Sequence, residues 1–177
     1  TGFTITKSYT PGKTHFPVKK VWNDADNQDG KRPTSVTVKL LADGQDTGKT
    51  LELNKENNWS GSFTDLDVNK AGKAIKYTIE EVAVAEYESK VTGDATSGFT
   101  ITNSYTTAKT KVSVTKKWDD KDNQDGKRPT SITVKLLADG QDTGKTLELT
   151  EANGWAGSFT NLDTDKGGAS IKYTVVE

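Results

Sequence analysis

The chain repeats itself with a period of 96 residues. Residues 2–10 read GFTITKSYT and residues 98–106 read GFTITNSYT (98 − 2 = 96), so that one position differs, Lys7 against Asn103. Residues 23–53 recur at residues 119–149 at the same offset with three changes. This period is too long for a solenoid unit of about 20–50 residues and suits a whole small domain. We therefore expect two copies of one domain.

The repeat also predicts the domain limits. We expect a complete domain at residues 11–106 and a second domain at residues 107–177, which lacks the last strands of the first. Residues 1–10 then correspond to the last strand of a preceding repeat. Two interpretations stay open for this segment: an arbitrary cut through a longer array, or a strand that docks into the second domain of a neighbouring molecule.

The dominant pattern within a copy is the alternation of apolar and polar residues. Val36, Val38 and Leu40 fall on one side of a strand, and turn signals such as Asp-Gly at residues 29–30 and 43–44 separate the segments. No segment has the pattern of an amphipathic helix longer than a turn or two. The sequence predicts an all-β fold, with tandem antiparallel β-sandwich domains of about seven short strands each.

Composition excludes several classes of function. The 24 basic and 25 acidic side chains give a net charge of −1, which argues against a nucleic-acid partner. No apolar run is long enough to insert into a membrane. The chain has no cysteine, so disulfides, thiol catalysis and cysteine metal sites are excluded. We expect no cofactor and no metal.

Three polar residues share the phase of the apolar residues of their strands, namely Lys20, Glu81 and Asn103. The apolar residues in phase with them are Phe16, Val18, Trp22, Ile75, Tyr77, Ile79, Phe99, Ile101 and Tyr105. In one interpretation they lie near strand ends and reach water, or Lys20 and Glu81 form an ordinary buried ion pair. Because burying a charge costs several kcal/mol per ion, roughly, three such groups suggest a role beyond stability.

The alternative interpretation is a reactive set. An apolar pocket favours the neutral amine of lysine and the neutral acid of glutamate. A neutral amine is a nucleophile, and Glu81 could polarise the Asn103 amide and shuttle protons. Attack of Lys20 on the amide carbon then expels ammonia and leaves a Lys-Asn isopeptide bond.

Several motifs resemble one known family. The pattern F-x-V-x-K-x-W at residues 16–22, YTIEE at residues 77–81, ITNSY at residues 101–105 and WNDADNQDGKRP at residues 22–33 are similar to those of collagen-adhesin B-type (Cna B-type) domains. The resemblance implies an inverse immunoglobulin, prealbumin-like sandwich. It also implies Lys20 as nucleophile, Asn103 as acceptor and Glu81 as catalytic acid.

The same resemblance implies a location and a function. Such domains form the stalks of cell-wall-anchored surface adhesins and pilins of Gram-positive bacteria, so we expect an extracellular protein at the bacterial cell surface with a part in virulence. The leading hypothesis is a structural stalk or spacer that contacts neighbouring repeats. The alternative is an adhesive module that itself binds a host matrix protein, for instance by strand addition. A turnover enzyme is not expected, because the reactive set would be consumed by its own reaction.

The second copy carries an incomplete set. Lys116 and Glu177 correspond to Lys20 and Glu81, whereas the position that matches Asn103 falls beyond residue 177. Lys7 stands at the asparagine position of the spare strand and has no electrophilic amide. Docking of residues 1–10 onto a second copy would therefore be non-covalent, with Lys7 paired to Glu177.

Other candidate sites have simpler interpretations. The acidic residues from Asp24 to Gly30 resemble a calcium loop, but the glycine is out of register and no glutamate stands at the twelfth position, so we expect a polar turn. His15, the single histidine, is expected at the surface. Trp59 and Trp155 lie near turns, and we expect them to pack against the sheets rather than to bind a ligand.

Overall fold

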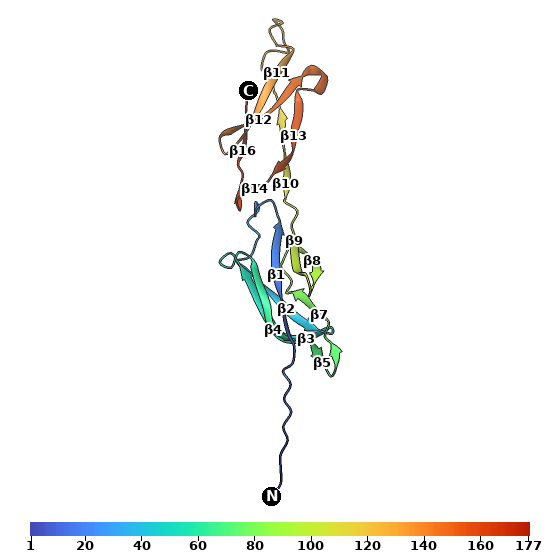
Figure 1. The fold of residues 1–177 in the computed structure, drawn as a ribbon. Helices are drawn as coiled ribbons and strands as arrows, with labels where there is room; N and C mark the ends of the chain where they lie inside the picture. Colours follow the sequence, from blue (N-terminus) through green and yellow to red (C-terminus); the bar gives the residue numbers. More distant parts are fainter. The chain divides into compact units, whose positions relative to one another are not determined.

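A computed structural model describes residues 1–177, and their contacts separate them into two units. Unit 1 comprises Thr1–Asp26 and Arg32–Tyr105, and unit 2 comprises Asn27–Lys31 and Thr106–Glu177. Almost all regular structure is β-strand (Figure 1). The single helical element is a short 3₁₀ turn, η1 (Glu151–Asn153). No helix is long and apolar enough to cross a membrane. The all-β prediction is confirmed.

Two sheets build unit 1. The first has four strands in the order β4-β1-β9-β8, and the second has three in the order β3-β2-β7. A small hairpin, in which the strands β5 and β6 have two residues each, completes the unit. The bounds are β1 Lys13–Asn23, β2 Ser35–Ala42, β3 Gln45–Asn54, β4 Ser60–Asp67, β5 Asn69–Lys70, β6 Lys73–Ala74, β7 Tyr77–Glu81, β8 Glu88–Asp94 and β9 Gly98–Ser104.

One pair of neighbouring strands in unit 1 is parallel. β1 pairs with β4 from Lys13 to Lys19 in antiparallel fashion and with β9 from Val18 to Asn23 in parallel. The alternation of residues predicts which side chains face inward but carries no information on strand direction. The parallel pairing brings the first and last strands of the unit side by side.

The core of unit 1 lies between its two sheets. Phe16 on β1 is 1% exposed and meets Phe99 of β9 with ring centroids 5.2 Å apart in an edge-on arrangement. The other buried apolar residues are Val18, Val36, Val38, Leu40, Leu53, Phe63, Leu66, Tyr77, Ile79 and Ile101. The inward phases predicted for β1, β7 and β9 are therefore correct.

Unit 2 repeats this plan with fewer strands. β10 pairs with β13 alone, and β11 lies between β12 and β16. The bounds are β10 Lys109–Thr115, β11 Ser131–Ala138, β12 Gln141–Thr150, β13 Ala156–Asp163, β14 Asp165–Lys166, β15 Ala169–Ser170 and β16 Tyr173–Val176. Its buried core is smaller and consists of Val134, Leu136, Leu149, Phe159 and Leu162.

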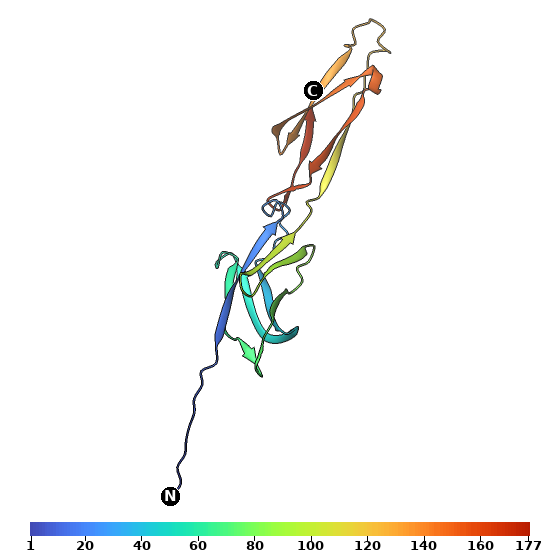
Figure 2. The same cartoon turned by 45° about the vertical axis from the view of Figure 1, so that its right-hand side comes forward.

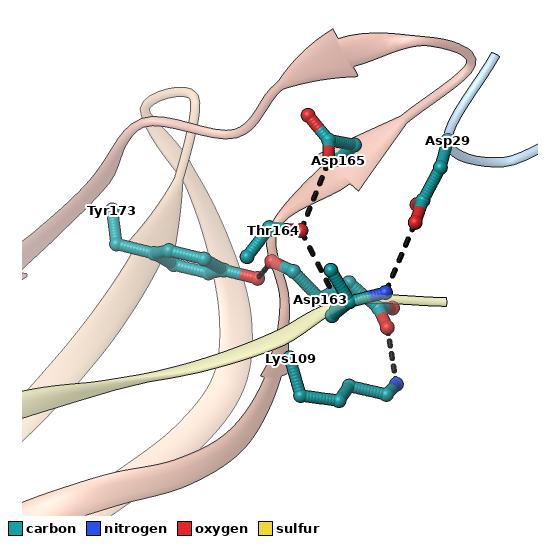
Figure 3. Close-up of polar contacts among 7 residues, drawn as sticks. Asp29, Lys109, Asp163, Thr164, Asp165 and Tyr173 are labelled. Atoms are coloured by element: carbon teal, nitrogen blue, oxygen red, sulfur yellow. Dashed lines mark hydrogen bonds and ion pairs between the residues drawn. The ribbon is translucent and has the colours of Figure 1, made fainter. Parts of the chain in front are cut away.

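The short segment Asn27–Lys31 belongs to unit 2 by its contacts, although the residues on either side of it belong to unit 1. The Asp29 carboxylate accepts a hydrogen bond from the Ala108 N–H at 3.0 Å, just before β10 (Figure 3). The Gln28 carbonyl accepts one from the Gly168 N–H at 2.7 Å. Gly30 has φ +68°, and a Cβ there would lie 2.7 Å from the Gly168 Cα, so this contact requires glycine. The repeat pattern does not predict this placement.

Polar contacts fix the ends of β13 and β16 beside that segment. Lys109 pairs with Asp163, and the Tyr173 hydroxyl donates to the Asp163 carbonyl at 2.8 Å (Figure 3). Lys109 is the main cause that holds the pKa of Asp163 below its usual value. Unit 1 contains the matching set, in which Lys13 lies 2.7 Å from Asp67.

Residues 1–12 have no regular secondary structure and lead into β1 as an extended segment (Figure 2). Phe3, Ile5 and Tyr9 are 98%, 88% and 86% exposed, respectively. Three large apolar or aromatic side chains in phase with one another are thus open to solvent.

Candidate functional site

Three strands of unit 1 carry Lys20, Glu81 and Asn103, and all three side chains are buried. Lys20 lies on β1 and Asn103 on β9, and the parallel register places Lys20 beside Ile101 and Trp22 beside Asn103. Glu81 comes from β7, in the other sheet. The side chains of Lys20 and Glu81 are 0% and 1% exposed, and Asn103 is 0% exposed. Strand phase and register therefore place all three groups in the core.

Lys20 and Glu81 are in direct contact. The Lys20 Nζ donates a hydrogen bond to the Glu81 Oε1 at 2.5 Å. Burial lowers the pKa of Lys20, and the contact with Glu81 opposes that shift without cancelling it. The neutral amine, which is the nucleophilic form of lysine, is therefore favoured relative to a lysine in water.

Three other buried polar atoms of these residues have no partner. The Glu81 Oε2 and both the Oδ1 and Nδ2 of Asn103 are buried and make no hydrogen bond. Leaving a buried polar group unpaired costs about 1–3 kcal/mol. A fully buried amide without a hydrogen bond is therefore costly to stability, which suggests that its role is chemical.

Aromatic rings cover the amine. The Lys20 Nζ lies 4.6 Å from the centre of the Trp22 ring. Trp22 in turn meets Trp59 and Tyr87 edge-on, with centroids 5.0 Å and 5.1 Å apart. Trp59 thus packs on the core as predicted, and Trp155 does the same against Trp118 in unit 2.

Tyr87 is a member of the site that the sequence pattern did not indicate. Its hydroxyl donates to the Asp24 Oδ2 at 2.8 Å, and Arg32 donates to both carboxylate oxygens of Asp24 at 2.6 Å and 3.0 Å. Burial, followed by the bond to Asp24, raises the pKa of Tyr87. The eight-residue spacing of Asp24 and Arg32, repeated at Asp120 and Arg128, is a sequence signal for the ion pair but not for Tyr87.

The candidate calcium loop is a turn held by side-chain hydrogen bonds. Its first acidic residue, Asp24, is bound by Arg32 and Tyr87. No group of three or more histidine or acidic side chains is arranged to hold a metal ion. His15 is exposed on β1, as predicted.

The incomplete set of unit 2 is also assembled but open to solvent. The Lys116 Nζ donates to the Glu177 Oε2 at 2.7 Å. Their side chains are 24% and 52% exposed, in contrast to the buried pair of unit 1. Lys7 lies in the exposed segment 1–12 and is not brought to either site.

A model of the Cna protein B-type domain matches residues 16–104 and residues 112–177. The chain belongs to this family. A collagen adhesin of Staphylococcus aureus is 49% identical over 173 residues, which are 98% of this chain and 14% of that protein. The crystal structure of two B repeat units (B1B2) of the collagen-binding protein Cna of the same organism is 46% identical, with a TM-score of 0.87 over 94% of this chain and 45% of that one.

These similarities establish the kind of molecule. The chain consists of B-type repeats of the kind found in a collagen adhesin, with a β-sandwich fold, and such repeats are structural domains rather than enzymes. It spans about one seventh of the length of the adhesin and less than half of the two-repeat structure.

Proposed function

We propose that the chain is a stalk or spacer segment of a bacterial surface protein, and that an intramolecular isopeptide bond between Lys20 and Asn103 locks unit 1. The observation that carries the proposal is the buried site itself. A lysine with a lowered pKa contacts a buried glutamate, and a buried asparagine on the strand that pairs with β1 makes no hydrogen bond.

The reaction needs no group from outside the chain. The neutral Nζ of Lys20 attacks the Cγ of Asn103 while Glu81, in its acid form, donates a hydrogen bond to the amide oxygen. The new Nζ–Cγ bond forms and the Cγ–Nδ2 bond breaks. Glu81 transfers a proton from the attacking amine to the leaving nitrogen, which departs as ammonia. Glu81 is the catalytic residue and is regenerated, but it acts once because both reactants are consumed.

The position of the bond suits a stalk. Lys20 and Asn103 lie on the first and last strands of unit 1, which are neighbours in the sheet. A covalent link there carries a pulling force directly from β1 to β9 and bypasses the intervening strands. It also closes a loop of 83 residues (103 − 20), worth about 4.5 kcal/mol in the chain-entropy account of crosslinks.

Intact mass of the denatured protein tests the proposal. The wild-type chain should be lighter than its sequence mass by one ammonia, and Lys20→Ala and Glu81→Gln should each restore the full mass. Glu177→Gln is the matched control and should leave the loss unchanged. Full sequence mass in the wild type would reject the crosslink.

A second candidate function is direct adhesion to a matrix protein, and it comes from the similarity to the collagen adhesin. The protein that is 49% identical is a collagen adhesin, so a repeat of this kind could itself bind a matrix protein. The exposed edges of the sheets would accept an extended segment of such a partner. Binding of the chain to immobilised collagen, compared with bovine serum albumin, separates an adhesive module from a spacer.

The proposed setting is the cell surface. We place the chain outside the cell, between neighbouring repeats of the same polypeptide, with attachment to the cell wall through another region. A crosslink made from lysine and asparagine supplies the covalent bracing that a chain without cysteine lacks.

A further inference from the structure

A hydrogen-bonded group of three side chains lies just past the strands that carry Lys20 and Asn103. It consists of Asp24, Arg32 and Tyr87, and we call it the Asp24 group. Asp24 follows β1 directly and is 2% exposed. Its carboxylate accepts two hydrogen bonds from Arg32, at 2.6 Å and 3.0 Å, and a third from the Tyr87 hydroxyl at 2.8 Å. A two-point contact of this kind fixes the direction of the guanidinium as well as its distance.

Both partners of Asp24 contact the ring of Trp22. The Arg32 Cζ lies 5.3 Å from the centre of that ring, and the Tyr87 ring meets it edge-on with centroids 5.1 Å apart. The Lys20 Nζ lies over the same ring at 4.6 Å. Trp22 is two residues after Lys20 on β1, so both side chains are on the same side of the strand. The Asp24 group thus holds the ring that covers the amine.

Tyr87 also contacts the strand that carries Asn103. Its ring centroid lies 5.5 Å from that of Tyr105, which is two residues after Asn103 and donates its N–H to the Asn23 carbonyl at 3.0 Å. β9 pairs with β1 in a register that places Asn103 opposite Trp22. The Tyr87 ring therefore contacts the residue two positions after each of the two reactants.

The contacts of the tryptophan with lysine and arginine recur in unit 2. The Lys116 Nζ lies 4.7 Å and the Arg128 Cζ 5.4 Å from the centre of the Trp118 ring. Arg128 donates to both carboxylate oxygens of Asp120, at 2.6 Å and 2.9 Å. The indole nitrogens of Trp22 and Trp118 are both buried and make no hydrogen bond. Packing alone therefore shields these two N–H groups from water.

We propose that the Asp24 group positions the Trp22 ring over the Lys20 amine and thereby sets the rate of the crosslink. This role depends on the reaction proposed for unit 1. The group takes no part in bond making or proton transfer, which stay with Lys20, Glu81 and Asn103. A site without water favours the neutral amine, and a fixed ring limits the positions of the Nζ. If the ring moves, water stabilises the ammonium form and the attack slows.

The rate of ammonia loss tests this role. Intact mass of the full chain is followed over time after cell-free synthesis. We expect the loss to be slower by about tenfold or more in Asp24→Ala, because a small displacement of a reactant costs up to about a hundredfold in rate. Asp120→Ala removes the matching carboxylate of unit 2 and should leave the rate unchanged.

The same time course separates this inference from the proposed function. Ammonia loss at equal rates in the wild type and Asp24→Ala overturns the positioning role and leaves the crosslink standing. A wild-type chain that keeps its full sequence mass rejects the crosslink, and the positioning role with it.

Hydrogen exchange at the indole nitrogens distinguishes a displaced ring from a general loss of stability. The chain has four tryptophans, so each indole N–H can be followed by NMR, in an Asn103→Ala background that cannot crosslink. Asp24→Ala should speed exchange at Trp22 and not at Trp118, and Asp120→Ala should do the reverse. If the backbone amides of β2 exchange faster by the same factor as Trp22, the unit is only destabilised and the inference is overturned.

Tyr87→Phe is a milder variant, because it removes one hydroxyl and keeps the ring. It should slow the ammonia loss less than Asp24→Ala does, since Arg32 stays bound to Asp24. In combination with Asp24→Ala it should cause no further slowing, because the hydroxyl has then already lost its partner. A Tyr87→Phe rate equal to that of the wild type overturns the inference even where Asp24→Ala does not fold.

Discussion

The first strands of units 1 and 2 differ in length, since β1 runs for 11 residues and β10 for 7, and residues 13–23 agree with residues 109–119 at five of eleven positions. In both, the first part of the strand pairs with its antiparallel neighbour, β4 or β13. β1 continues beyond that part, and there it pairs with β9 as far as Asn23. The additional length of β1 thus coincides with its pairing to β9.

The same difference separates the two lysine–glutamate pairs. The side chains of Lys20 and Glu81 are buried in the core, whereas those of Lys116 and Glu177 are partly exposed to solvent. A charged pair in water needs no chemical explanation, since its contribution to stability is small. A buried pair in a unit whose buried Asn103 amide has no hydrogen-bond partner does need one, and matched substitutions in the two units test this difference.

The largest expected effect comes from the crosslink. Asn103→Ala should remove the covalent loop and lower the free energy of unfolding of unit 1 by about 4.5 kcal/mol, the loop-closure value. Chemical denaturation followed by tryptophan fluorescence measures it. Lys116→Ala is the control, because unit 2 holds no matching loop, and it should shift the unit 2 transition far less. Equal shifts in the two units would contradict the comparison.

A middle-sized effect is expected from the core. Val18→Ala should destabilise unit 1 by about 2 kcal/mol, since Val18 is 1% exposed and its removal leaves a cavity. Val114→Ala, at the matching position of unit 2, should cost less than half as much because that side chain is only partly buried. Denaturation midpoints of the two variants test this, and an equal or larger loss from Val114→Ala would contradict the difference in burial.

The smallest effect concerns the segment Asn27–Lys31. Asp29→Ala should remove the hydrogen bond to the Ala108 N–H and cost unit 2 about 1 kcal/mol, with faster amide exchange at Ala108. Asp125→Ala is the matched control, because Asp125 is the exposed counterpart of Asp29 in the second copy. Unchanged exchange at Ala108 in the Asp29 variant would contradict the assignment of this segment to unit 2.

Much of the candidate site could be predicted from the sequence. Period-2 alternation placed Lys20, Glu81 and Asn103 on the inward side of their strands, because side chains of a strand alternate between its two faces. Tyr87 could not be found in this way. It lies outside the regular strands, and its role depends on a hydrogen bond to Asp24, which is 63 residues away along the chain.

The repeat, the all-β class and the inward phase of the three polar residues could be read from the sequence, because they follow from local periodicity. The parallel pairing of β1 with β9, the contact between Lys20 and Glu81, and the lack of hydrogen-bond partners for the Asn103 amide emerge only in the folded chain. The fold also places Asn27–Lys31 in unit 2. These properties depend on which strands become neighbours and how much water they exclude, and no local pattern of residues specifies either.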